Sequence, residues 1–235
     1  MDVERFERGL HEIFADFPSS TEPRGRRFTR ILEEVPGLAR ENNLALLNLA
    51  ASMLEPGESY VEVGVWNATS LIAAMVGNEG DFVGIDDFSF RDASPEQVQA
   101  NLERFGLEGA TILEGDAFAL IPSGALGERR VAVYYYDAGH EYRQQLEALR
   151  MIEPYLAERA LLIVDDTDWE QVEAATRDYL KRQPRARLLV WIPGKSKGFP
   201  AWWEGVQVLA WEADAVDQPL EVAVEAVALE LAETR

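Results

Sequence analysis

The stretch Glu62-Val63-Gly64-Val65-Trp66-Asn67-Ala68-Thr69-Ser70 decides the fold of this chain. The apolar run Tyr60–Val65 predicts a buried strand, Gly64 predicts a tight turn, and the residues from about Ala68 predict the start of a helix. A strand, a glycine turn and a helix in immediate succession are typical of an open α/β sheet, in which the ligand binds beside the turn.

From Tyr60 onward, short apolar runs alternate with amphipathic stretches. Helical patterns separate most of the runs, as at Pro95–Phe105, Tyr142–Leu156 and Trp169–Lys181. The expected strands are Tyr60–Val65, Phe82–Ile85, Ala110–Leu113, Val131–Tyr136, Leu161–Val164, Leu188–Ile192 and Val206–Trp211. Such alternation predicts a parallel sheet with helices on both faces. The last two strands are joined without a helix, so we expect a Rossmann-like, doubly wound, mostly parallel seven-stranded α/β sheet whose last strand is antiparallel.

The chain divides into three expected parts. Residues 1–57 form an N-terminal helical cap, with apolar residues at helical spacing on both sides of a break at residues 19–25. Residues 58–213 form the ligand-binding domain. Residues 214–235 form a C-terminal tail that packs on this domain or takes part in an oligomer contact, and its composition fits a helix or a strand equally.

Composition limits the partners of this chain. It has 235 residues with 42 acidic and 22 basic side chains, a formal net charge of −20. Nucleic-acid binding needs a basic surface, so we expect no nucleic-acid partner. No apolar run is long enough to span a bilayer, the N-terminus lacks a signal layout and cysteine is absent. We therefore expect a cytoplasmic protein without a membrane partner, and leave a homodimer open.

The glycine turn favours one kind of nucleoside ligand over another. Trp66 occupies the second glycine position of the dinucleotide fingerprint, where its ring would crowd a pyrophosphate. Asp86 ends the next strand, about 20 residues past the turn, where a carboxylate can accept hydrogen bonds from ribose hydroxyls. Asp116-Ala117 follows the third strand at the same sheet edge. Helix capping is the alternative role for each aspartate.

Carboxylates also follow the next two strands. Asp137 comes after Val131–Tyr136, and Asp165-Asp166 after Leu161–Val164. Their convergence at one edge of a parallel sheet is costly unless a cation or proton lies among them, and oxygen ligands suit Mg²⁺, Mn²⁺ or Ca²⁺. His140 is a candidate proton acceptor because its pKa lies near neutrality. The segment Thr167–Glu170 has the form of a capping box, which places Asp168 in a first helical turn.

Together these motifs resemble class I S-adenosylmethionine-dependent methyltransferases. The resemblance covers about Tyr60 to Trp211 and is strongest to the small metal-dependent O-methyltransferases of the macrolide-sugar and catechol type, including methyltransferase family 24. Asp137-Ala-Gly-His140-Glu-Tyr142 is similar to the D-G-x-H-x-Y stretch of the sugar O-methyltransferases. The resemblance implies cofactor contacts at Glu62, Gly64, Trp66, Asn67, Ala68, Ser70, Asp86, Asp116, Ala117 and Asp137, and metal ligands at Asp137, Asp165 and Asp166.

The implied activity is methyl transfer from S-adenosyl-L-methionine to the hydroxyl of a small-molecule acceptor, assisted by Mg²⁺ or another divalent cation. His140 or Asp137 takes the proton. The acceptor is expected to meet the N-terminal helices, Asp87–Asp92 and residues 195–203. Two alternatives remain: a metal-independent methyltransferase, and a non-catalytic protein that binds the cofactor on the same fold. A nicotinamide-dependent oxidoreductase is a third and less favoured alternative, because Trp66 occupies the second glycine position of the dinucleotide fingerprint.

Overall fold

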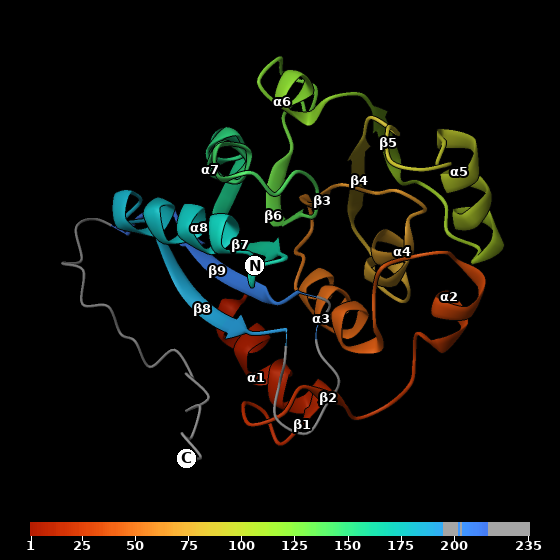
Figure 1. Cartoon of the computed structure of the whole chain (residues 1–235), viewed down its shortest axis with the longest axis horizontal. Coiled ribbons are helices and arrows are strands. Elements are labelled where there is room, and N and C mark those ends of the chain that lie inside the picture. The colour runs from red at the N-terminus through yellow and green to blue at the C-terminus, as the bar shows by residue number, and fades with distance from the viewer. Residues whose placement is uncertain (195–201, 203, 216–235) are drawn as a thin grey trace.

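A seven-stranded sheet with helices on both faces forms the body of the protein (Figure 1). The computed structural model describes residues 1–194, 202 and 204–215. The strands lie in the order β5-β4-β3-β6-β7-β9-β8. Their bounds are β3 Glu58–Val63, β4 Asp81–Asp86, β5 Thr111–Glu114, β6 Arg130–Tyr136, β7 Leu156–Asp165, β8 Ala186–Ile192 and β9 Val206–Glu212.

The pairing of the strands confirms the predicted fold class. β3, β4, β5, β6 and β7 pair in parallel, while β9 inserts between β7 and β8 and is antiparallel to both. Val63 pairs with Tyr136, and Tyr136 with Val164. The polar segments that follow these three residues therefore leave the sheet side by side.

Two apolar cores form on opposite faces of the sheet. One contains side chains of α1 (Val3–Ile13), α2 (Thr29–Glu34), α3 (Glu41–Ala51), α4 (Thr69–Met75) and α5 (Pro95–Arg104). The other contains side chains of α6 (Ala117–Leu120), α7 (Tyr142–Met151) and α8 (Glu170–Arg182). Helices on both faces make the sheet doubly wound, as the alternating pattern predicted.

One helix is shorter than expected, and the strand after it is longer. The pattern Tyr142–Leu156 predicted a single helix, but α7 ends at Met151 and a 3₁₀ turn follows at Glu153–Tyr155. Pro154 cannot donate the backbone hydrogen bond that a continued helix needs. β7 then begins at Leu156 rather than Leu161.

The N-terminal segment is only partly helical. α1 and α3 confirm the two helical patterns, whereas the break between them contains a short antiparallel pair, β1 (Phe14–Ala15) with β2 (Glu22–Pro23). The buried Trp202 is bonded to this segment, because its indole N–H donates to the hydroxyl of Thr21 at 2.8 Å. The hairpin escaped prediction because its strands are two residues long.

The buried side chain of Asn48 joins α3 to α4. The amide nitrogen of Asn48 donates to the carbonyls of Ala73 at 2.7 Å and Val76 at 2.9 Å. Its amide oxygen accepts a hydrogen bond from Arg27 at 2.9 Å. The N-terminal segment is thereby held against the helix that follows the Gly64 turn.

The expected capping box at Thr167–Glu170 is wrong. α8 begins at Glu170 with Trp169 at its N-cap, and no side chain caps it. Asp168 instead accepts a hydrogen bond from the amide of Gly194 at 2.8 Å, and its own amide donates to the carbonyl of Glu204. The amide of Thr167, which the Glu170 side chain would accept from in a capping box, donates to the carbonyl of Gly205 at 3.4 Å. The hydroxyl of Thr167 has no hydrogen-bond partner among the described residues.

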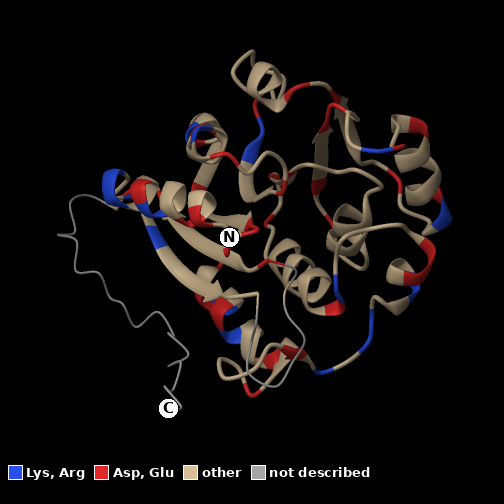
Figure 2. Ribbon diagram, in the orientation of Figure 1, with Lys and Arg blue, Asp and Glu red and all other residues tan. Residues whose placement is uncertain are grey.

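Acidic residues are spread over the helices and loops of the described chain (Figure 2). None of the described helices has the length and apolar character that a membrane crossing requires. The expected contacts of residues 195–201 and 203, and the expected tail at 216–235, lie outside the described residues.

Candidate active site

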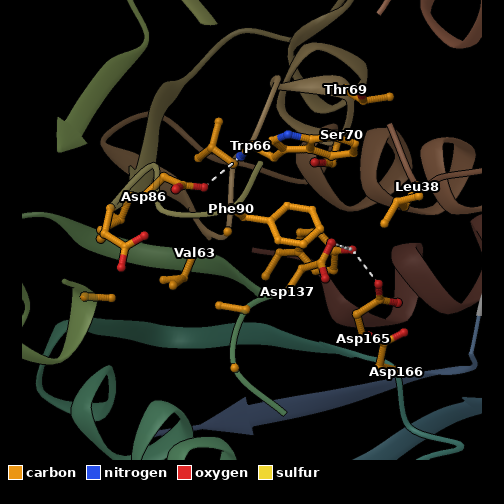
Figure 3. A pocket seen from close by; sticks show the side chains of 18 of the residues that line it. Leu38, Val63, Trp66, Thr69, Ser70, Asp86, Phe90, Asp137, Asp165 and Asp166 are labelled. Carbon is orange, nitrogen blue, oxygen red and sulfur yellow. Dashed lines mark hydrogen bonds between the residues drawn. The ribbon is translucent and has the colours of Figure 1, made fainter. Parts of the chain in front are cut away.

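A pocket of about 480 Å³ opens where β3, β4, β5, β6 and β7 end (Figure 3). This is the edge at which open α/β sheets bind ligands, and the volume is within the range for small-molecule sites. The Gly64 turn and the ends of β4 and β5 form one part of its wall, and the ends of β6 and β7 another. Residues 37–39 and α3 contribute Leu38, Asn43, Leu44 and Leu47.

The Gly64 turn is held by a very close backbone contact. Gly64 has φ +95°, and a Cβ atom at this position would lie 1.8 Å from the carbonyl oxygen of Asp137. The amide of Asp137 donates to the carbonyl of Val63 at 2.9 Å. Only glycine fits this conformation in this space, so Gly64 is required to hold β3 against the end of β6.

The predicted cofactor loop is only partly exposed to the pocket. Gly64, Trp66 and Ser70 line it, and α4 begins just after Ala68, at Thr69. Asn67 and Ala68 are buried behind the wall, and the Asn67 amide donates to the carbonyl of Pro36 at 3.0 Å. Asn67 therefore connects the loop to the N-terminal segment.

Glu62 also lies behind the wall, fully buried in a polar cluster. It accepts hydrogen bonds from the hydroxyl of Ser70 at 2.5 Å and from that of Tyr60 at 2.8 Å. Burial raises the pKa of Glu62 to about 8, although both hydrogen bonds act in the opposite direction. The cluster joins β3 to the first turn of α4.

Asp86 ties two loops together at the pocket wall. Its carboxylate accepts a hydrogen bond from the amide of Trp66 at 2.7 Å (Figure 3). It accepts another from the amide of Phe88 at 2.6 Å. Each carboxylate oxygen can accept a second hydrogen bond. Asp86 lines the pocket, so it fixes the Gly64 turn and keeps further hydrogen-bond acceptor capacity beside the pocket.

Asp116 and Ala117 both line the pocket where β5 ends. Asp116 is the N-cap of α6, because its carboxylate accepts a hydrogen bond from the amide of Phe118 at 2.9 Å. Asp116 therefore caps a helix, which was its alternative role. The other carboxylate oxygen of Asp116 does not take part in that hydrogen bond.

The three aspartates predicted as metal ligands come together. One carboxylate oxygen from each of Asp137, Asp165 and Asp166 lies within 4.8 Å of the others. Burial, together with the neighbouring carboxylate of Asp166, raises the pKa of Asp137 to about 6. Burial also raises the pKa of Asp165 well above its usual value. Three converging carboxyl groups with raised pKa values at Asp137 and Asp165 are the arrangement that a bound cation would relieve.

Asp166 provides the direct test of whether the cluster fits a cation. It is 7% exposed, and its Oδ1 atom has no hydrogen-bond partner among the described residues. A buried charged oxygen without a partner is costly, and a hard cation such as Mg²⁺ satisfies such an atom. The donor set of carboxylate oxygens therefore fits a divalent cation.

His140 lies beside this cluster, as predicted. Its Nε2 atom is 2.8 Å from Oδ2 of Asp166, and its ring packs against Trp169 with a centroid distance of 4.9 Å. The hydrogen bond with Asp166 raises the pKa of His140. With Nε2 donating to Asp166, the Nδ1 atom is the one that can accept a proton.

Tyr135 is a site residue that the sequence analysis missed. Its hydroxyl lies 3.1 Å from Oδ2 of Asp137 and 3.1 Å from Oδ2 of Asp165. A signal for it was present, because residues two apart on a strand share a face and Tyr135 precedes Asp137 by two. The apolar surroundings of Val131–Tyr136 concealed this polar role.

Apolar side chains lie at the mouth of the pocket. Phe90 is 50% exposed and Leu38 is 39% exposed, and both line the pocket. The Phe90 and Trp66 rings meet edge to face at 5.3 Å, and the guanidinium of Arg91 lies over both rings. Phe90 belongs to the segment Asp87–Asp92 that is expected to meet the acceptor.

Comparisons with known proteins agree with the motifs. Residues 61–167 match the model of a family described as a methyltransferase domain. No curated protein matches the chain in sequence. The family match runs from within β3 to just past the end of β7 and includes all three clustered aspartates.

Solved structures share the whole fold. Cofactor-bound Rv0187 from MTB is 18% identical with a TM-score of 0.60, and the match covers 90% of this chain and 96% of that one. The SAH-bound Podospora anserina methyltransferase PaMTH1 is 12% identical with a TM-score of 0.57, covering 89% and 95%. The O-methyltransferase NovP is 19% identical with a TM-score of 0.54, covering 72% and 78%. The chain thus has this fold and resembles class I methyltransferases, as predicted.

Replacing Gly64 with alanine should destabilise the fold by about 3 kcal/mol or more, because the left-handed strain and the collision with the Asp137 carbonyl add. Gly106 is the matched control, since its φ is +67° and no atom lies within 4 Å of the position that a Cβ would take. Gly106→Ala should cost only about 1–2 kcal/mol. Denaturant unfolding measures both, and equal losses would contradict the close contact.

Glu62 makes stability depend on pH. Its folded-state pKa is above its ordinary value of 4.5, so its contribution is complete below that pH and is lost as the pH rises through about 8. In this window the group should lower the free energy of unfolding by up to about 1.4 kcal/mol per pH unit. Glu62→Gln cannot titrate, so its unfolding free energy should fall less steeply between pH 5 and 8.

Urea unfolding at several pH values compares this variant with the wild type and with Glu103→Gln, which alters an exposed carboxylate on α5. The Glu103→Gln curve should run parallel to that of the wild type. A Glu62→Gln curve that is also parallel would show that Glu62 ionises normally in the folded protein.

Proposed function

We propose that this chain is an S-adenosyl-L-methionine-dependent methyltransferase that methylates a hydroxyl oxygen of a small molecule with the help of a divalent cation. The observation that carries the proposal is the meeting of Asp137, Asp165 and Asp166 in the pocket beside the Gly64 turn. The methyltransferase-domain match and the shared fold support the methyl-transfer part. The cation and the hydroxyl acceptor rest on the acidic cluster.

The cofactor would lie along the wall made by the Gly64 turn, Asp86 and Ala117. Gly64 allows a ligand to approach the backbone, and Asp86 offers its remaining acceptor sites to the ribose hydroxyls. The ring of Trp66 would crowd the position where a dinucleotide places its pyrophosphate. These features favour a nucleoside with a short tail, such as S-adenosylmethionine, over a dinucleotide.

The divalent cation would be held by Asp137, Asp165 and Asp166, whose oxygens converge from the ends of β6 and β7. When bound, the cofactor supplies an electrophilic methyl group and the cation lowers the pKa of the acceptor hydroxyl. Binding of both in one pocket would align the reactants, and such alignment can contribute roughly 7–11 kcal/mol to lowering the barrier.

His140 would take the proton of the acceptor hydroxyl at Nδ1, while its Nε2 remains paired with Asp166. Asp137 is the second candidate for this role, since it lines the same pocket. Phe90 and Leu38 would contact the apolar part of the acceptor and exclude water from the mouth.

The direct test is methyl transfer to a panel of hydroxyl acceptors with and without Mg²⁺. Asp165→Asn/Asp166→Asn should abolish Mg²⁺-dependent turnover and leave the affinity for S-adenosylhomocysteine unchanged, because the cofactor wall is intact. The matched control is Glu108→Gln/Glu128→Gln, which removes two exposed carboxylates that precede β5 and β6, at the opposite edge of the sheet. This control should turn over normally.

Three outcomes separate the alternatives. Turnover that survives in chelator would replace the metal-assisted reaction with a metal-independent one. Cofactor binding without turnover on any acceptor would indicate a non-catalytic binding protein. Binding of NAD in place of S-adenosylhomocysteine, detected as a rise in melting temperature, would contradict the methyltransferase proposal itself.

A further inference from the structure

Three consecutive tyrosines end β6, and they lie on two faces of the sheet. Tyr134 and Tyr136 belong to the core beneath α6, α7 and α8. Tyr135 belongs to the opposite core and lines the pocket. Because successive side chains on a strand alternate, Tyr135 shares its face with Asp137 rather than with its two tyrosine neighbours.

The Tyr135 hydroxyl bridges carboxylates from two different strands. It lies 3.1 Å from an oxygen of Asp137, just after β6, and 3.1 Å from an oxygen of Asp165, at the end of β7. The side chain is 4% exposed. A phenol carries its proton near neutral pH, so the Tyr135 hydroxyl has one proton to donate.

A single phenolic proton between two carboxyl groups has a structural consequence. The hydroxyl donates its one proton to either of these oxygens and contacts the other, so it keeps one oxygen of each group close to it against the repulsion that would drive two buried carboxylates apart. The other oxygen of each carboxyl group is left outside this hydrogen bond. Groups that orient metal ligands in this way commonly control how tightly the metal binds.

We propose that Tyr135 is a positioning residue that sets the spacing of Asp137 and Asp165 for a divalent cation. The inference rests on the proposed metal-assisted function, and it adds a residue that does not itself contact the cation. Tyr135 acts only through the two aspartates, so its removal should change cation affinity without changing the cofactor wall at Gly64 and Asp86.

Tyr135→Phe tests this role, because it removes the hydroxyl and keeps the buried ring. Titration with Mn²⁺ in the presence of S-adenosylhomocysteine should show affinity reduced by about 10- to 100-fold. The affinity for S-adenosylhomocysteine should stay at the wild-type value. The melting temperature should change by no more than about 4 °C.

Tyr134→Phe is the matched control from the same strand. Its hydroxyl is buried on the opposite face without a hydrogen-bond partner among the described residues. Removing an unpaired buried hydroxyl leaves nothing unsatisfied, so Mn²⁺ affinity and stability should match the wild type.

The remaining outcomes are distinguishable. If Tyr135→Phe binds Mn²⁺ as tightly as the wild type, the positioning role is overturned and the proposed metal site stands. If cation affinity, cofactor affinity and melting temperature all fall together, Tyr135 has a general structural role and the inference is also overturned. If the wild type binds no Mn²⁺, the metal part of the proposed function fails and this inference fails with it.

Discussion

The contact between Gly64 and the carbonyl of Asp137 is the constraint on which the site depends. A side chain at Gly64 would occupy the space of that carbonyl oxygen, so β3 and the end of β6 approach each other only because position 64 is glycine. The same contact places the Gly64 turn next to the first of the three clustered aspartates. The loop that would hold a cofactor and the carboxylates that would hold a cation are thus brought together by one backbone approach.

Buried polar groups then fix the surroundings of this contact. Glu62 joins the strand to α4 through Ser70, Asp86 joins the Gly64 turn to the loop after β4, and Asn67 joins it to the N-terminal segment. Each of these side chains makes hydrogen bonds inside the protein, so the pocket wall is held in place before a ligand arrives. Such preorganisation is what alignment of two reactants requires.

The sequence predicted the sheet well because its information is local. Each strand is a short apolar run, and parallel pairing places the ends of consecutive strands at one edge, so the convergence of Asp137, Asp165 and Asp166 followed from strand order alone. Features set by tertiary contacts were harder to predict. Thr167–Glu170 has the pattern of a capping box, but the carbonyl of Gly205 accepts the hydrogen bond from the Thr167 amide. Tyr135 reads as an apolar strand residue until β7 brings Asp165 beside it.

The central claim is that one pocket places S-adenosylmethionine beside a divalent cation. The most direct measurement is a crystal structure of the protein with S-adenosylhomocysteine and Mn²⁺, with the metal located by its anomalous scattering. We expect one Mn²⁺ peak bound by Asp137, Asp165 and Asp166, with the nucleoside against Gly64 and Asp86. A nucleoside bound elsewhere, or an occupied nucleoside site without metal at the three aspartates, would contradict it.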